Sequence, residues 1–135
     1  MTPSQPSLRG VNHITLVCAD LNRSISFYTN ALNATLRAKW TRGAYVEIGP
    51  LWLCLEQGHP TRRDDDSHVA LDCAQEDFEA LSAQISARAL LWKDNTSEGA
   101  SLYFLDPDGH KLELHVGSLE TRLAEYFGRS DVTLY

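Results

Sequence analysis

The strongest constraint on the fold is an internal repeat. At an offset of 55 residues, four residues of the first half (His13, Leu16, Cys18 and Ala19) correspond to four identical residues of the second half (His68, Leu71, Cys73 and Ala74). Each copy opens with a strand pattern of alternating polar and aliphatic residues. A helical pattern follows, at 21–32 in the first copy, where Asp20 can cap the helix, and at 75–87 in the second.

Three short strand patterns follow each predicted helix. They lie at about 34–40, 43–48 and 51–56, and again at about 89–93, 100–105 and 110–116. Neither copy has a second layer against which to bury its sheet, so the two copies are expected to combine. The sequence therefore predicts an α+β fold in which two paired βαβββ modules, at about 11–56 and 67–116, form one curved sheet around a cavity.

The predicted strands also share a two-faced character. In each strand, aliphatic residues point one way and polar or aromatic residues point the other way. Tyr45, Trp52 and Tyr103 all lie on the polar faces. Aromatic side chains fit a ligand cavity better than an open, water-facing sheet, so these faces are predicted to line a pocket.

Three potential metal ligands lie on these polar faces. His13 opens the first strand of one copy, His68 stands at the same place in the other, and Glu113 lies in the last strand. A lone histidine on a strand is more often a hydrogen-bonded structural residue than a ligand, but the repeat gives both histidines equivalent positions. Two imidazoles and one carboxylate suit a divalent metal and leave coordination positions open, as a catalytic site requires.

Size and composition set further bounds. The 135 residues, 43% of them hydrophobic, fit one domain, expected at 8–122 between a flexible tail (1–7) and a C-terminal helix end and tail (123–135). A net charge of −6 without a basic stripe argues against nucleic acid as a partner. No apolar run suits a membrane, residues 1–10 lack a signal-peptide core, and the odd count of 3 cysteines favours reduced thiols. A cytoplasmic location is therefore expected.

Several stretches resemble a known family. NHITL (12–16), GAYVEIGPLWLCL (43–55) and above all WKDNTSEGASLYFLDPDGHKLELHVGSLETRL (92–123) are similar to the FosA group of fosfomycin-resistance glutathione transferases. That group belongs to the vicinal oxygen chelate superfamily, which also holds glyoxalases, bleomycin-resistance proteins and dioxygenases. The resemblance runs from about Leu8 to Arg122, and the paired modules derived above are the fold of that superfamily.

The resemblance implies an activity and a set of site residues. His13, His68 and Glu113 would hold Mn²⁺ or another divalent metal, which acts as a Lewis acid while a glutathione thiolate opens the epoxide of fosfomycin. The implied catalytic residues are Thr15, Tyr45, Lys93, Tyr103 and Arg122. The implied substrate-binding residues are Thr15, Trp52, Lys93, Ser97, Ser101, Tyr103 and Arg122. A K⁺-binding loop is implied at Asn95, Ser97, Gly99 and Ser101.

The resemblance also implies a homodimer in which two chains exchange modules. In this group the first histidine of one chain joins the second histidine and the glutamate of its partner. A C₂ dimer would satisfy both strand-rich modules at once. We therefore expect composite sites, each completed by His13 from the other copy.

Four residues differ from the pattern of the better-known members. Arg42, Glu56, Thr96 and Asp66 stand where other residue types are usual, all on the thiol side of the pocket. These differences bear on how glutathione is held. They leave in place the metal ligands and the residues that the resemblance assigns to the phosphonate group of fosfomycin, which are Lys93, Ser97, Tyr103 and Arg122.

Three other functions stay open at this point. One is another enzyme of the superfamily, of glyoxalase or dioxygenase type. A second is an epoxide hydrolase, for which Glu47 is the candidate base for water. A third is a drug-sequestering protein of the bleomycin-resistance type, which lacks the metal triad.

Overall fold

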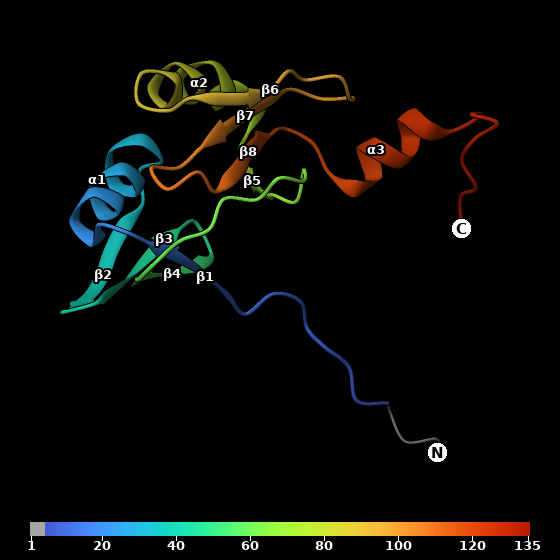
Figure 1. Ribbon diagram of the computed structural model, residues 1–135. Helices are drawn as coiled ribbons and strands as arrows, with labels where there is room; N and C mark the ends of the chain where they lie inside the picture. The colour runs from blue at the N-terminus through green and yellow to red at the C-terminus, as the bar shows by residue number, and fades with distance from the viewer. Residues whose placement is uncertain (1–4) are drawn as a thin grey trace.

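The computed structural model describes residues 5–135, and its elements follow the predicted repeat (Figure 1). The first module contains β1 (His13–Cys18), α1 (Leu21–Ala31), β2 (Thr35–Trp40), β3 (Gly43–Ile48) and β4 (Leu51–Gln57). The second contains β5 (Val69–Asp72), a 3₁₀ turn (Gln75–Asp77), α2 (Phe78–Ser86), β6 (Leu91–Lys93), β7 (Ser101–Leu105) and β8 (Lys111–His115). A last helix, α3 (Leu119–Tyr126), follows. The predicted order of strand, helix and three strands is confirmed in both modules.

The two modules have the same sheet topology. The strand orders are β1-β4-β3-β2 and β5-β8-β7-β6, and in each sheet only the first pair is parallel. Among residues 5–135 the sheets are separate, so one chain does not form the single curved sheet that the sequence predicted. In this structure β1 and β5 are edge strands, each at the end of its own sheet.

The helices pack against the aliphatic sheet faces and join the two modules in one core. Phe27 and Tyr28 of α1 and Ile85 of α2 are buried together with sheet residues of both modules, among them Val46, Leu55, Phe104, Leu112 and Leu114. Asp20 caps α1 as predicted, because its side chain accepts a hydrogen bond from the Arg23 amide over 3.0 Å. The longest helix of residues 5–135 has 11 residues, and none has the length and apolar character needed to cross a bilayer.

A buried polar contact ties the second module to α1. The turn at 106–110 connects β7 to β8, and its Asp106 accepts a hydrogen bond from the Tyr28 hydroxyl over 2.8 Å. Asp108 of the same turn accepts from the Ala19 amide (3.1 Å), the Ser24 hydroxyl (3.3 Å) and the Arg23 guanidinium (2.9 Å). Both carboxylates are buried, so their hydrogen bonds cannot be replaced by water at little cost. The modules are therefore held together on their helix-covered side.

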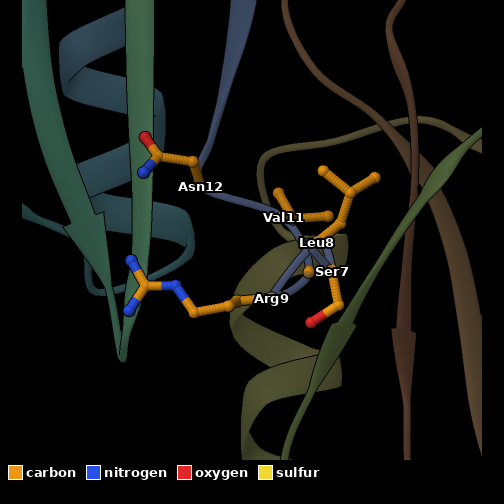
Figure 2. Close-up of a pocket in the computed structure, with 6 residues that line it drawn as sticks. Ser7, Leu8, Arg9, Val11 and Asn12 are labelled. Carbon is orange, nitrogen blue, oxygen red and sulfur yellow. The ribbon is translucent and has the colours of Figure 1, made fainter. Parts of the chain in front are cut away.

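Residues 5–12 and the chain from α3 onward extend away from the modules (Figure 1). Figure 2 shows a hollow lined entirely by the segment before β1, from Ser7 to Asn12. In that segment Leu8 is 97% exposed and Val11 is 77% exposed. None of the predicted site residues lines this hollow, so it is a bend of extended chain and not the predicted pocket.

Candidate metal centre

The structure brings together two of the three predicted metal ligands. Glu113 lies in the middle of β8 and is only 6% exposed, and its Oε1 is 2.8 Å from His68 Nε2. His68 lies directly before β5, and its Nδ1 is 2.6 Å from the backbone carbonyl oxygen of Asp66. That carbonyl can only accept, so His68 donates through Nδ1–H.

The His68–Glu113 pair has the donor chemistry of a metal site. A neutral His68 with its proton on Nδ1 directs the lone pair of Nε2 toward Glu113 Oε1, which is also an acceptor. Two acceptors at this distance repel each other unless a cation lies between them or one of them takes up a proton. A divalent cation satisfies both, and the Asp66 carbonyl supplies the outer hydrogen bond that fixes the imidazole of a metal ligand.

His13 lies apart from this pair within one chain. Its ring stacks on Trp52 with 4.4 Å between ring centroids, and its Nδ1 is 2.7 Å from the side-chain oxygen of Asn12. Within residues 5–135, no group of three or more His, Cys, Asp or Glu side chains is placed to hold one metal ion. A single chain thus supplies an incomplete set of the predicted ligands.

An aromatic wall continues from His13 across the first sheet. Trp52 contacts Tyr45 edge-on at 5.2 Å between centroids, and Tyr45 contacts Trp40 at 4.8 Å. Thr15 follows His13 by two residues in β1 and pairs with Cys54 of β4. The three aromatic residues of the wall are 37% to 45% exposed, an unusual state for large rings. A contiguous aromatic surface of this kind is typical of a binding or association face.

A second aromatic group surrounds His68 on the other sheet. The His68 ring lies 5.8 Å from Tyr103 and 5.4 Å from Trp92, and these two rings are 5.2 Å apart. The Lys93 ammonium lies 5.3 Å from the Tyr103 centroid. Trp92 was not among the predicted site residues, because the three-residue strand β6 pairs irregularly and offers too little alternation to assign its face. The resemblance to WKDNTSEGA is the signal that contained it.

The predicted K⁺-binding loop is an ordered turn. Asn95 Nδ2 donates to the Gly99 carbonyl over 2.9 Å, and Asn95 Oδ1 accepts from the Ser97 amide over 3.1 Å. Ser101, at the start of β7, turns toward the predicted metal ligand Glu113 instead, and its hydroxyl donates to Glu113 Oε2 over 2.7 Å. The four loop residues therefore divide between a closed turn and the metal centre.

The two predicted phosphonate cations both lie beside carboxylates. Arg122, from α3, donates to Glu98 over 3.0 Å, a hydrogen bond that raises the pKa of Arg122, and its Nη2 lies 3.5 Å from Ser97 Oγ. Lys93 Nζ lies 3.7 Å from a carboxylate oxygen of Asp66. Arg122 thus lies in α3 and contacts the loop at 95–101 through Glu98 and Ser97.

Glu47, the candidate base for a hydrolase, forms an ion pair with Arg37 on the neighbouring strand. Both side chains are more than two-fifths exposed, at 60% for Arg37 and 43% for Glu47. A carboxylate oxygen that is occupied by a guanidinium is not free to accept a proton from water, so this position does not favour the hydrolase.

Comparisons with known proteins match the chain to a family and to several relatives. A family model described as the Glyoxalase/Bleomycin resistance protein/Dioxygenase superfamily matches residues 10–114. Glutathione transferase FosA of Serratia marcescens is 51% identical over 123 residues, which cover 87% of each chain. Metallothiol transferase FosB of Lysinibacillus sphaericus is 32% identical, over 89% of this chain and 91% of its own.

The solved structures include a close match in shape. A mutant of the fosfomycin resistance protein FosX from Listeria monocytogenes, in complex with Mn(II) and 1S,2S-dihydroxypropylphosphonic acid, superposes with a TM-score of 0.81 at 31% identity. The match covers 89% of this chain and 99% of FosX. The chain therefore belongs to the glyoxalase/bleomycin resistance protein/dioxygenase superfamily and, within it, to the FosA group.

Proposed function

We propose that this chain is a metal-dependent glutathione transferase that opens the epoxide ring of fosfomycin and so confers resistance to it. The observation that carries the proposal is the His68–Glu113 pair, an imidazole nitrogen 2.8 Å from a buried carboxylate oxygen, in a chain whose relative, FosA of Serratia marcescens, is a glutathione transferase. In the reaction, the thiolate sulfur forms a bond to an epoxide carbon, the carbon–oxygen bond breaks, and the released alkoxide takes up a proton.

The metal ligands are proposed to be His68 and Glu113 together with His13. The Mn(II) in the FosX structure supports Mn²⁺ as the first choice. A divalent metal held there supplies Lewis acidity to the epoxide oxygen. Tyr103, 6% exposed and in edge contact with the His68 ring, limits the access of water to this side of the pocket.

The phosphonate is proposed to bind between Lys93 and Arg122. The hydroxyls of Thr15, Ser97 and Tyr103, all on the polar sheet faces or the adjoining loop, supply further hydrogen bonds. Ser101, also predicted to bind substrate, lies beside them, but its one hydroxyl proton is directed to Glu113 Oε2. Trp52 and Tyr45 form the opposite wall, which lies on the other sheet. K⁺ is proposed to bind at Asn95, Ser97, Gly99 and Ser101, of which the first three bring side-chain and backbone oxygens together in one turn.

A homodimer with shared sites is proposed because one chain is incomplete. His13 and its aromatic wall lie on one sheet, whereas His68 and Glu113 lie on the other, and the two sheets are separate in a single chain. A second copy that presents its first module to the second module of this chain would supply His13 and cover the exposed aromatic rings. The cytoplasmic location and the domain limits 8–122 stay predictions.

The mass of the product tests the proposed reaction. Incubation with fosfomycin, Mn²⁺ and glutathione is expected to yield an adduct heavier than fosfomycin by one whole glutathione. A product heavier by one water would instead identify a hydrolase and make Glu47 the residue to substitute next. An adduct with other thiols but not with glutathione would overturn the choice of co-substrate.

A further inference from the structure

Two polar side chains form a hydrogen-bonded group with Glu113, on its second carboxylate oxygen, Oε2. Ser101 on β7 and His115 on β8 are paired across the two strands. Ser101 Oγ lies 2.7 Å from Glu113 Oε2 and 2.6 Å from His115 Nδ1. The His115 side chain is 17% exposed and that of Glu113 is 8% exposed, so water contributes little to this group. The proposed function gives His115 no role.

The protons of this group can be assigned by counting donors and acceptors. An ionised Glu113 only accepts, so the single hydroxyl proton of Ser101 points to Glu113 Oε2. Ser101 Oγ must then accept from His115, which requires the imidazole proton to be on Nδ1. The result is a chain from His115 Nδ1–H through the Ser101 hydroxyl to the carboxylate. A charged acceptor at its end strengthens both hydrogen bonds.

The His115 ring lies so close to Gly99 and Gly117 that a side chain at either position would press against it. A Cβ atom at Gly99 would lie 3.0 Å from His115 Cε1 and 2.4 Å from the Val116 carbonyl oxygen. A Cβ atom at Gly117 would lie 3.0 Å from His115 Nε2. Both glycines have positive φ, +79° and +140°, which side chains rarely adopt. The imidazole thus packs closely against the backbone at both glycines.

We propose that His115 is a positioning residue for the metal centre. Through Ser101 it holds Glu113 Oε2, and this leaves Oε1 aimed at the position beside His68 Nε2. The inference rests on the proposed function, because it takes Glu113 to be a ligand of a divalent metal. Removing an outer hydrogen bond of a metal ligand typically lowers metal affinity by about 10- to 100-fold.

The first test measures Mn²⁺ affinity directly, from the electron paramagnetic resonance signal of free Mn²⁺, without any turnover. His115→Ala is expected to weaken binding by about 10- to 100-fold, and Ser101→Ala by a similar factor. His115→Asn, whose amide N–H replaces Nδ1–H, is expected to recover most of the affinity. His59→Ala, at an exposed histidine of the connector between the modules, is the matched control and should bind as the wild type does. Unchanged affinity in His115→Ala, or an equal loss in His115→Asn, overturns the inference.

The second test needs neither metal nor a variant. Ring ¹⁵N spectra of the metal-free protein are expected to show His115 as the Nδ1–H tautomer, and an Nε2–H tautomer overturns the inference. A wild-type chain that binds no Mn²⁺ also overturns it, but through failure of the proposed function. The ¹⁵N spectrum distinguishes the two failures. If the proposed function alone is wrong, His115 still shows the Nδ1–H tautomer although the chain binds no Mn²⁺.

Discussion

Tyr28→Phe removes the hydroxyl that ties α1 to the turn at 106–110. Tyr28 is 1% exposed and Asp106 is 5% exposed, and the hydroxyl donates to the carboxylate over 2.8 Å. Water cannot take the place of the lost donor at so buried a position. Because hydrogen bonds to charged groups contribute about 1.5–3 kcal/mol, the free energy of unfolding at neutral pH is expected to fall by about 2–3 kcal/mol.

The same hydroxyl gives the prediction a pH signature. Burial, followed by the Asp106 carboxylate, holds the pKa of Tyr28 well above its ordinary value of 10.0. Above that pH the unfolded chain loses the proton while the folded chain keeps it, so the wild type loses up to about 1.4 kcal/mol of stability per pH unit from this group. The phenylalanine variant has no such proton. The stability difference between the two proteins should therefore be full at neutral pH and shrink above about pH 10.

Urea unfolding at one chain concentration, at neutral pH and at about pH 11, measures this difference. Tyr135→Phe is the control, because Tyr135 is fully exposed and its substitution should change little at either pH. A loss below about 0.5 kcal/mol for Tyr28→Phe at neutral pH, the size of an ordinary surface effect, would refute the reasoning. A difference that stays constant with pH would refute the assignment of the proton.

Three further predictions concern the site. Glu113→Ala should abolish Mn²⁺ binding and activity while the circular dichroism spectrum is kept, and full metal occupancy in the variant would contradict the ligand assignment. Inactive His13→Ala chains and inactive Glu113→Ala chains that are unfolded and refolded together should regain activity, because one of the two sites in each heterodimer then has all its ligands. A mixture that stays inactive would mean that sites are not shared. Replacing K⁺ by a bulky organic cation at constant ionic strength should lower the rate through the loop at 95–101, and an unchanged rate would make that loop purely structural.

The sequence predicted the parts of the fold that depend on local pattern. The 55-residue repeat and the alternation of aliphatic and polar residues located the strands and helices, and Asp20 marked the start of α1. The same alternation placed Glu113 and Tyr103 on one face, where the structure has them as direct cross-strand partners. These features follow from periodicity and capping, which a single sequence displays.

Contacts between distant segments were beyond that reasoning. The burial of Asp106 and Asp108 against α1 depends on how a turn meets a helix some 80 residues earlier in the chain, and acidic residues beside proline and glycine read as an exposed turn. The Ser101–His115 contact was likewise hidden, because alternation gives the face of a residue but not its hydrogen-bond partner. The separation of the two sheets depends on which edges meet, and no local pattern reports that.

The pairing of both candidate phosphonate cations with carboxylates makes anion binding an exchange of partners. Arg122 forms an ion pair with Glu98, and Lys93 forms one with Asp66, so each cation already has an anionic partner before a ligand binds. A ligand with one negative charge would replace one carboxylate by another and gain little from the exchange. If the phosphonate binds between Lys93 and Arg122 as proposed, a doubly charged phosphonate would replace both carboxylates at once, and selectivity for a dianion would depend on the resting ion pairs as well as on the cations. Added salt weakens the resting pairs along with the bound state, and for that reason the affinity should depend on ionic strength less steeply than the count of cations suggests.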